Sequence, residues 1–240
     1  MAFLSGQTII IIIITACILY YLHQFLRKKS HEYSSKSYWE GRYGLFSKRM
    51  DWYTNYAQLN RDFNIDDLIK KKYPSNTYKK RILEMGCGNS TLSYDLYNSG
   101  FKNITAIDFS TVVIKEMSKI YNNTSISYEV CDFNNMTFYF EPKTFDIVIE
   151  KAGLDSIATK GTDDVPNLLY KVFKNIHYIL CDGGIMLSFS SKNTNFWRTT
   201  IYDRLENEKM FKVLGTKRTI FRTKGKEVNM NLYFAYLIKI

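Results

Sequence analysis

The sequence predicts a doubly wound α/β fold, in which a mainly parallel sheet carries helices on both faces. Beyond Tyr78, short apolar runs of strand length alternate with longer runs of helical periodicity. This order builds parallel strands that are joined by right-handed crossovers. Residues 211–240 instead hold two strand-like runs around a polar loop, which predicts a C-terminal antiparallel hairpin. An uncharged apolar segment at the N-terminus predicts one transmembrane helix ahead of this domain.

Seven short runs have the composition of strands. The first five are apolar and are bounded by glycine or acidic residues, as is typical of strands that are buried on both faces of a parallel sheet. The last two form the hairpin. The predicted strands cover residues 82–85, 104–107, 126–131, 145–149, 185–189, 211–221 and 232–240.

Three longer segments between the strands have helical periodicity, and they cover residues 90–98, 110–121 and 165–180. The second begins at Ser110, whose hydroxyl suits an N-cap because it accepts a hydrogen bond from a free backbone N–H of the first turn. The segment Asp182-Gly183-Gly184 predicts a turn between the third helix and the fifth strand.

Composition narrows the class of partner. The chain has 240 residues, 45% of them hydrophobic, and a formal net charge of +10. Its basic residues are scattered, as on a solvated surface, and no arginine-rich arm or zinc-finger spacing accompanies them. We therefore expect no nucleic-acid partner. The cysteines form no C-x-x-C pair and the histidines lack metal-ligand spacing, so no metal site is predicted.

The N-terminal segment, residues 1–26, contains no lysine, arginine, aspartate or glutamate. Because about 20 apolar residues cross a bilayer, we interpret it as a transmembrane anchor. Arg27, Lys28 and Lys29 follow, and the positive-inside rule keeps this flank in the cytosol. A cleaved secretory signal is the alternative, but its charges would precede the apolar run. The sequence thus predicts an anchor (1–26), a basic tether (27–36) and the α/β domain (37–240) of a single-pass membrane protein, with the domain facing the cytosol.

The ligand-binding edge of such a sheet lies beyond the carboxyl ends of its strands. Glu84, Gly86 and Gly88 lie at the end of the first predicted strand, and Asp108 and Asp132 close the next two. Glycine allows a tight turn and close approach of a ligand. A carboxylate after the second strand suits ribose hydroxyls, and one after the third suits an adenine amino group. Together they predict an adenosine site.

The spacing of the glycines separates two classes of adenosine ligand. The dinucleotide fingerprint requires a third glycine three residues after the second, so that the helix approaches a pyrophosphate. Thr91 occupies that position, and no G-K-[ST] follows the glycines. S-adenosyl-L-methionine has no pyrophosphate and carries a cationic sulfonium, so an acid such as Glu84 is tolerated nearby. We therefore predict this methyl donor as the cofactor.

The motifs along residues 38–240 resemble those of the elongation factor 1-alpha lysine methyltransferases, a group of class I methyltransferase-like proteins. The resemblance implies a Rossmann-like, seven-stranded methyltransferase fold and a protein substrate, with a translation elongation factor as a candidate. The motifs that carry it are Tyr38-Trp39-Glu40-Gly41-Arg42-Tyr43, Asp51-Trp52-Tyr53, Gly86-Cys87-Gly88-Asn89-Ser90, Asp108-Phe109-Ser110, Glu150-Lys151 and Leu154-Asp155.

The resemblance also implies roles for single residues. An N-terminal segment would fold over the cofactor and supply aromatic faces, which suit an adenine ring and a cation. Gly86 would line the methionine end. The remaining contacts would come from the strand ends. The residues implied are Trp39, Tyr43 and Trp52 in the covering segment, Asp108 and Phe109 at the ribose and adenine, Asp132 and Phe133 at the adenine edge, and Lys151 after the fourth strand.

The predicted reaction is an in-line methyl transfer, in which the enzyme mainly aligns a nucleophile with the sulfonium methyl. A lysine substrate must also lose a proton. A carboxylate can orient the lysine ammonium group or accept this proton. Glu150 and Asp155 are our candidates, with a structural loop carboxylate as the alternative for each. Two other functions stay open: a methyltransferase of a small or lipid-soluble molecule at a membrane, and a non-catalytic scaffold.

Two departures from the family pattern lie close to this site. The usual lysine-glycine-threonine-leucine-aspartate reads Lys151-Ala152-Gly153-Leu154-Asp155 here, and the histidine-containing segment near the C-terminus reads Asn229-Met230-Asn231-Leu232. The usual proline-glycine-glycine before the fifth strand is also replaced, by Cys181-Asp182-Gly183-Gly184. We expect the changes at residues 151–155 and 181–184 to leave cofactor binding intact.

Overall fold

The computed structural model describes residues 12–21, 32–45, 49–160, 162–222 and 229–240. Its core is one seven-stranded sheet in the order β3-β2-β1-β4-β5-β7-β6. The first five strands run parallel, and β7 is antiparallel to both of its neighbours. The predicted mainly parallel sheet with a C-terminal antiparallel hairpin is therefore confirmed.

Each predicted strand forms, with ends within a few residues of those expected, apart from the start of the fifth. That strand begins earlier and takes in Asp182, Gly183 and Gly184, where we expected a turn. The ladder jumps from the pair Phe145–Leu180 to the pair Ile147–Ile185, so these residues form a bulge inside the strand. The strands are β1 (Arg81–Met85), β2 (Asn103–Asp108), β3 (Ser127–Val130), β4 (Phe145–Lys151), β5 (Leu180–Ser190), β6 (Phe211–Arg222) and β7 (Asn229–Lys239).

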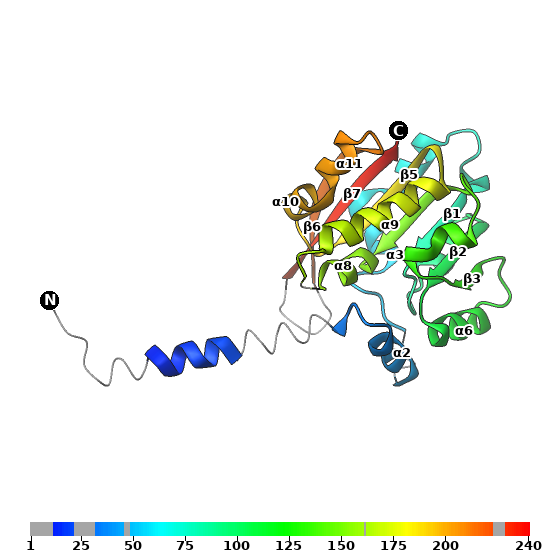
Figure 1. Cartoon of the computed structure of the whole chain (residues 1–240). Helices are drawn as coiled ribbons and strands as arrows, with labels where there is room; N and C mark the ends of the chain where they lie inside the picture. The colour runs from blue at the N-terminus through cyan, green and yellow to red at the C-terminus, as the bar shows by residue number, and fades with distance from the viewer. Residues whose placement is uncertain (1–11, 22–31, 46–48, 161, 223–228) are drawn as a thin grey trace.

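The sheet has two apolar faces, and each is covered by its own set of helices. One face packs against α3 (Tyr56–Phe63), α4 (Ile65–Lys72), α5 (Leu92–Asn98) and α6 (Thr111–Ile120), with α2 (Lys36–Leu45) beside α6. The opposite face packs against α7 (Met136–Tyr139), α8 (Gly153–Ala158), α9 (Val165–Ile179), α10 (Thr194–Trp197), the π-helix η3 (Arg198–Tyr202) and α11 (Asp203–Asn207). Short 3₁₀ turns, η1 (Thr77–Lys79) and η2 (Phe133–Asn135), precede β1 and α7. Figure 1 shows α9 lying along the sheet.

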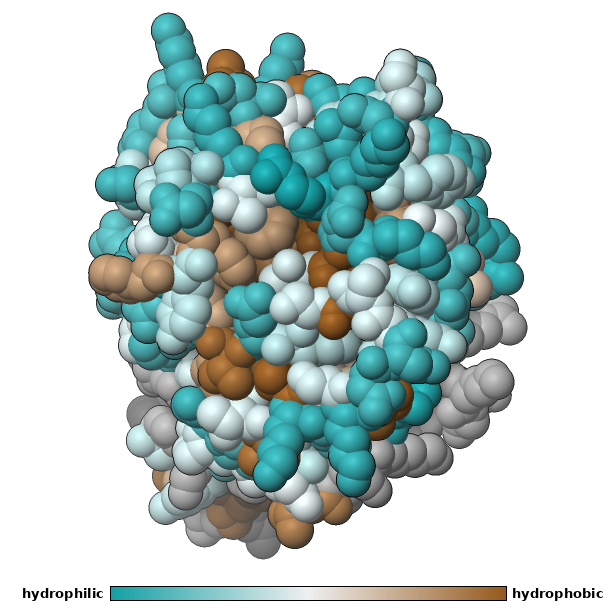
Figure 2. All heavy atoms as spheres, turned by 90° about the vertical axis from the view of Figure 1, so that its right-hand side faces the viewer, coloured by the Kyte–Doolittle hydropathy of each residue, from teal (hydrophilic) through white to brown (hydrophobic). Residues whose placement is uncertain are grey.

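Successive side chains of one strand pack into the apolar layers on opposite faces of the sheet. In β1, Ile82 packs among α3, α5 and α6, whereas Leu83 and Met85 pack under α9. A strand buried on both faces explains the continuous apolar runs in the sequence. The outer face on the β3 side of the molecule is predominantly hydrophilic, with separate hydrophobic areas between polar side chains (Figure 2).

The predicted anchor, residues 1–26, lies partly outside the described residues. Residues 12–21 are helical. The hydrocarbon core of a bilayer is about 30 Å thick. No helix in the described chain is both long and apolar enough to cross a membrane. The predicted single-pass membrane localisation, with the N-terminal helix as a membrane partner, is therefore wrong. Residues 27–31 of the predicted tether lie outside the described residues.

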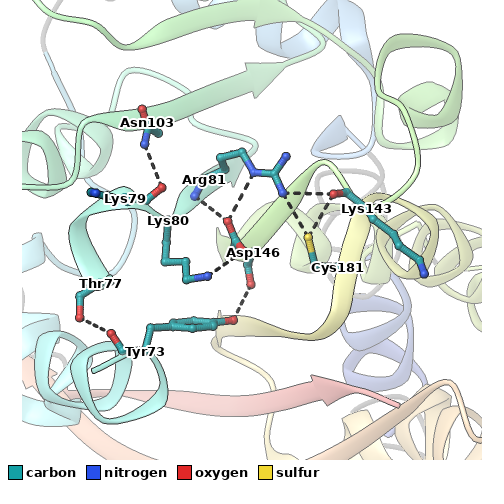
Figure 3. Close-up of polar contacts among 9 residues, drawn as sticks. All are labelled: Tyr73, Thr77, Lys79, Lys80, Arg81, Asn103, Lys143, Asp146 and Cys181. Atoms are coloured by element: carbon teal, nitrogen blue, oxygen red, sulfur yellow. Dashed lines mark hydrogen bonds and ion pairs between the residues drawn. The ribbon is translucent and has the colours of Figure 1, made fainter. Parts of the chain in front are cut away.

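The amino-terminal edge of the sheet is held together by Asp146, at the start of β4 (Figure 3). Its carboxylate accepts hydrogen bonds from the Arg81 backbone N–H at 2.9 Å and from Lys80 Nζ at 3.1 Å. Its backbone carbonyl accepts one from the Tyr73 hydroxyl at 2.9 Å. Burial opposes ionisation, but these donors and charges hold the pKa of Asp146 below its usual value. This edge has a structural role, and the site described next lies at the opposite edge.

Candidate active site

A cavity of about 370 Å³ opens at the carboxyl ends of β1, β2 and β4. It lies where the strand order reverses between β1 and β4, which is the switch point at which such sheets bind ligands. With the exception of Glu150, every site residue that we predicted lines this cavity. The lining residues from the prediction are Trp39, Tyr43, Trp52, Glu84, Gly86, Gly88, Asp108, Phe109, Asp132, Phe133, Lys151 and Asp155.

The glycine loop after β1 forms the floor of the cavity. Gly86 and Gly88 have φ angles of +68° and +50°, a left-handed conformation that other residues rarely adopt. A Cβ at Gly88 would lie 2.7 Å from the Tyr43 hydroxyl, and one at Gly86 would lie 3.1 Å from Phe133 Cζ. Glycine is therefore required at both positions because aromatic side chains approach the backbone closely.

Asp108 ties the end of β2 to this loop. Its two carboxylate oxygens accept hydrogen bonds from the Gly88 N–H at 3.0 Å and the Ser110 N–H at 2.9 Å. Burial raises the pKa of Asp108 to about 6 despite these donors. The carboxylate is thus ionised at neutral pH, and each oxygen keeps a lone pair that can accept from a ligand hydroxyl. Asp132, beyond β3, accepts from the backbone and side chain of Asn134 at 2.8 and 2.9 Å.

An aromatic segment ahead of the domain covers the cavity. Trp39 stacks on Tyr43 with ring centroids 5.7 Å apart and meets Trp52 edge-on at 5.8 Å. The Trp39 indole donates to the Tyr33 carbonyl at 2.7 Å. Tyr33 and Ser34, which we assigned to the tether, also line the cavity. Sequence reasoning missed them because the tether prediction depended only on charge.

Glu40, which carried no predicted role, fastens this segment to the rest of the molecule. Its carboxylate accepts from the Thr111 backbone N–H at 2.9 Å and from the Thr111 hydroxyl at 3.1 Å. The acceptor therefore caps the amino terminus of α6, where unpaired N–H groups and the helix dipole favour an anion. The aromatic segment, of which residues 33–45 and 49–56 are described, is held over the cavity by this contact and by the two that follow.

The second contact joins Asp51 to Lys151. The Lys151 ammonium donates to Asp51 Oδ1 at 2.8 Å and to the Thr54 carbonyl at 2.9 Å, and its side chain is only 3% exposed. Ser90 of the glycine loop donates to the same Asp51 oxygen at 2.5 Å. Burial opposes ionisation of Asp51, but Lys151 and Ser90 hold its pKa below the usual value. The motif Asp51-Trp52-Tyr53 was available in the sequence, but we assigned a role only to Trp52.

The third contact centres on Asp155, in α8. Its carboxylate accepts from the Tyr53 hydroxyl, from Ser190 Oγ at 2.5 Å, and from the Ser191 N–H and Oγ at 2.8 and 2.9 Å. Three of these donors converge on Oδ2 and one, Ser190, reaches Oδ1. Each carboxylate oxygen offers about two lone-pair positions, so Oδ2 is saturated and Oδ1 keeps one. Tyr53 itself has a φ of +68°, which places its ring in the cavity wall. Asp155 thus links the aromatic segment to the end of β5.

Glu150 lies behind the cavity wall. It is fully buried, and it accepts from the Ser188 hydroxyl and from the Leu154 N–H at 3.1 Å. Burial raises the pKa of Glu150 to about 8. Because the even-numbered residues at the end of β4 point under α8 rather than towards the glycine loop, Glu150 supports the first turn of α8. Its predicted catalytic role has no support from this position.

The first departure from the family pattern has a visible cause. Ala152 has a φ of +70°, where the family's glycine would be unstrained. A Cβ at Gly153 would meet Phe133 Cζ at 3.1 Å and the Met85 carbonyl at 3.4 Å. The threonine that is usual there is therefore incompatible with this position of Phe133. In this chain the backbone strain therefore lies at Ala152, and Gly153 leaves the space that Phe133 occupies.

We expect Ala152→Gly to raise the free energy of unfolding by about 0.5–1 kcal/mol. The left-handed conformation costs an alanine about 1–2 kcal/mol, and the greater freedom of glycine in the unfolded chain offsets up to about 1 kcal/mol. Urea denaturation measures the change. Ala158→Gly, in the right-handed α8, is the matched control and should destabilise the protein. An Ala152→Gly protein no more stable than the wild type would contradict the strain at this position.

Glu84, at the end of β1, accepts a hydrogen bond from the Ser93 hydroxyl and is 2% exposed. Burial raises its pKa to about 7. A ligand cation nearby favours the ionised form, so binding of a cation releases a proton. We expect the affinity for S-adenosylmethionine to rise about tenfold from pH 6 to pH 8, with a smaller rise for the product, which lacks the sulfonium. Titration calorimetry at both pH values tests this, and Glu84→Gln should remove the difference.

The cavity extends towards β5 beyond the residues that we predicted. This part is called the β5 end. The residues that line it are Ile157 of α8, Thr159 and Lys160 after α8, Leu168 of α9, Ser191 and Lys192 after β5, and Met230 of β7. These residues lie far apart in the sequence and share no motif. The only signal for them is the family departure at residues 229–232, which includes Met230.

The donors and acceptors fit the predicted cofactor. The left-handed glycines open the backbone to a ligand, the buried Asp108 carboxylate suits ribose hydroxyls, and Phe109 and Phe133 border the adjacent wall. Glu84 and the aromatic rings suit a cation. The individual contacts remain predictions, because each role is inferred from the position of the residue.

Comparisons with known proteins agree with this arrangement. A family model described as a methyltransferase domain matches residues 76–228. EEF1A lysine methyltransferase 4 of Mus musculus is 30% identical over 184 residues, which are 71% of this chain and 66% of that protein. The eEF1A lysine and N-terminal methyltransferase of Xenopus laevis is 32% identical over 171 residues, which are 69% of this chain but only 23% of that longer protein.

The fold is also found among solved structures. A SAM-dependent methyltransferase from Methanosarcina mazei superposes with a TM-score of 0.54 at 14% identity, and the match covers 67% of this chain and 92% of that one. At this identity the likeness supports the fold alone. The family model covers more than half of the chain, from the glycine loop to the hairpin. The chain therefore belongs to the methyltransferase domain family and is an S-adenosylmethionine-dependent methyltransferase.

Proposed function

We propose that this enzyme methylates the side-chain amine of a lysine in a protein. The observation that carries the proposal is the similarity to eEF1A lysine methyltransferases over about 70% of the chain. A translation elongation factor is accordingly the first substrate to test. The family motifs surround the predicted cofactor site, whereas the β5 end departs from the family pattern at residues 229–232.

The bound cofactor supplies an electrophilic methyl group on a sulfonium, and the enzyme has to present a neutral amine in line with it. The glycine loop, Asp108 and Glu84 are proposed to hold the cofactor. The aromatic segment covers the cavity and excludes water, which strengthens the electrostatic contacts within it. Lysine methylation therefore requires that a substrate side chain enter from another direction, and the β5 end provides one.

The two carboxylates predicted as catalytic fit positioning roles better. Asp155 accepts from Tyr53, Ser190 and Ser191, which saturate Oδ2 and leave one lone-pair position on Oδ1. It is proposed to lock the aromatic segment against β5 rather than to accept the substrate proton, which water can take. Glu150 is proposed to hold the first turn of α8, which carries Asp155.

The alternatives have lost their support. A small or lipid-soluble acceptor was favoured by the predicted membrane anchor, and no helix of the described chain can cross a bilayer. A non-catalytic scaffold disagrees with the family assignment and with the cluster of buried carboxylates around the glycine loop.

The test is incubation of the full chain with methyl-labelled S-adenosylmethionine and either recombinant elongation factor 1A or a cell extract. We expect label in acid-precipitable protein and, after hydrolysis, in methylated lysine. The Asp108→Ala enzyme is the control for cofactor-dependent labelling. Label that enters only solvent-extractable molecules, or amino acids other than lysine, would refute the proposal.

A further inference from the structure

We propose that Lys160 and Lys192 form an anion-recognition pair at the β5 end, which selects acceptor lysines flanked by aspartate or glutamate. The inference rests on the proposed lysine methylation and adds the sequence context of the acceptor. Both lysines line the cavity, on the side where a substrate chain would approach.

The other charged residues that line the cavity are engaged. Glu84 accepts from Ser93, Asp108 from two backbone N–H groups, Asp132 from Asn134, and Asp155 from four donors. Lys151 is paired with Asp51. Within the described part of the chain, Lys160 and Lys192 form no ion pair with a carboxylate. The neutral donors leave the carboxylates charged, but Asp155, which accepts from Ser191 next to Lys192, is buried. The charged residues among those that line the β5 end are therefore these two lysines.

The backbone position of Lys192 is fixed by the same network as Asp155, and that of Lys160 by the turn that ends α8. The Lys192 N–H donates to Ser190 Oγ at 2.9 Å, and Ser190 in turn donates to Asp155. The Trp197 indole N–H donates a hydrogen bond to the same Ser190 oxygen at 2.8 Å. The Lys192 ammonium lies 4.9 Å from the centre of the Phe196 ring. The Lys160 N–H donates to the Ile157 carbonyl at 3.0 Å, in the turn that ends α8.

Two fixed cations beside an acceptor site affect the choice of substrate. They repel a peptide segment rich in lysine or arginine, and they attract one that carries carboxylates next to the acceptor. A partly exposed ion pair changes affinity by up to about fivefold, so two pairs should together give a preference of about tenfold. Like other exposed charge pairs, they weaken as salt increases.

The test uses the full chain and three capped peptides, Ala-Ala-Xaa-Lys-Xaa-Ala-Ala, in which Xaa is glutamate, glutamine or arginine. We expect kcat/KM to fall in that order, by about tenfold between glutamate and glutamine, and the gap to narrow from 50 to 500 mM NaCl. Lys160→Glu and Lys192→Glu should each reduce the gap, and the double variant should favour arginine. Lys174→Glu, on the exposed side of α9, is the matched control and should preserve the order.

Binding of the same three peptides, now labelled, to the protein loaded with S-adenosylhomocysteine requires no methyl transfer. It therefore tests the anion-recognition pair separately from the proposed lysine methylation. Equal affinities for the glutamate and glutamine peptides would overturn the anion-recognition pair, as would an unchanged order in the double variant. If the glutamate peptide binds more tightly but no peptide is methylated, the anion-recognition pair stands, and the labelled amino acid in the protein assay above decides the lysine proposal.

Discussion

Replacing Asp108 with alanine is expected to weaken the binding of S-adenosylhomocysteine by at least about 100-fold. A hydrogen bond to a charged group contributes about 1.5–3 kcal/mol, and the predicted ribose contact offers two hydroxyls to this carboxylate. The loss of about 3 kcal/mol corresponds to two powers of ten in affinity. The same substitution removes the acceptor of the Gly88 and Ser110 N–H groups, so the glycine loop should also loosen. Titration calorimetry on the full chain measures the affinity.

A general loss of stability has to be separated from loss of the site. Asp146→Ala is a matched control, because Asp146 also accepts from a backbone N–H and from charged side chains, but at the opposite edge of the sheet (Figure 3). It should lower stability and leave the affinity unchanged. Asp108→Asn keeps the size of the side chain and should still lose most of the affinity. A folded Asp108→Ala protein that binds within a few-fold of the wild type would exclude Asp108 from the site.

The parallel sheet is predictable from the sequence because its central strands, β1, β4 and β5, are buried on both faces. Such strands appear as short, continuous apolar runs, and the acidic or glycine residue after each run marks the edge where ligands bind. Asp108 and Asp132 illustrate this: each follows a run of strand length, and both reach the same cavity although 24 residues separate them. The hairpin is predictable because a mainly polar loop, residues 222–231, separates its two runs.

The short helices are not predictable in this way. The α8 helix has six residues, too few to show a helical period, and it forms because Glu150 accepts from its first turn and Leu154 packs into the core. Glu150 and Asp155 both follow β4 closely in the sequence. Only the structure separates them, because the alternation of side chains along β4 places Glu150 under the helix.

Contacts between distant segments are also hidden in the sequence. Lys151 and Asp51 are 100 residues apart and both are predicted to lie near the cofactor site or its motifs, but nothing in the local sequence pairs them. Hydrophobicity alone was likewise a poor guide at the N-terminus. A run of apolar residues indicates an anchor only if it forms a long enough helix, and among the described residues no helix is both long and apolar enough to cross a bilayer.

Replacing Lys151 with methionine is expected to lower the free energy of unfolding by about 2–4 kcal/mol. The ammonium is buried and donates to Asp51 and to the Thr54 carbonyl. Removal of one partner of a buried pair costs about 3–5 kcal/mol, since the other charge loses its compensation. Asp51 retains some exposure, which reduces the cost. Methionine keeps most of the side-chain volume, so the change reports charge rather than a cavity. Urea denaturation of the cofactor-free protein gives the value.

The double variant Asp51→Asn/Lys151→Met distinguishes two roles for Lys151: holding the aromatic segment in place, and contacting the cofactor directly. If the pair mainly holds the aromatic segment over the cavity, the double variant should recover more than half of the stability lost in Lys151→Met, because no unpaired charge remains. If Lys151 acts only on the cofactor, Lys151→Met should weaken S-adenosylhomocysteine binding while the stability of the free protein stays unchanged. If Lys151→Met lowers the free energy of unfolding by less than about 1 kcal/mol, Lys151 does not hold the aromatic segment in place and acts on the cofactor instead. A large loss with recovery in the double variant would assign the ion pair to closure of the cavity.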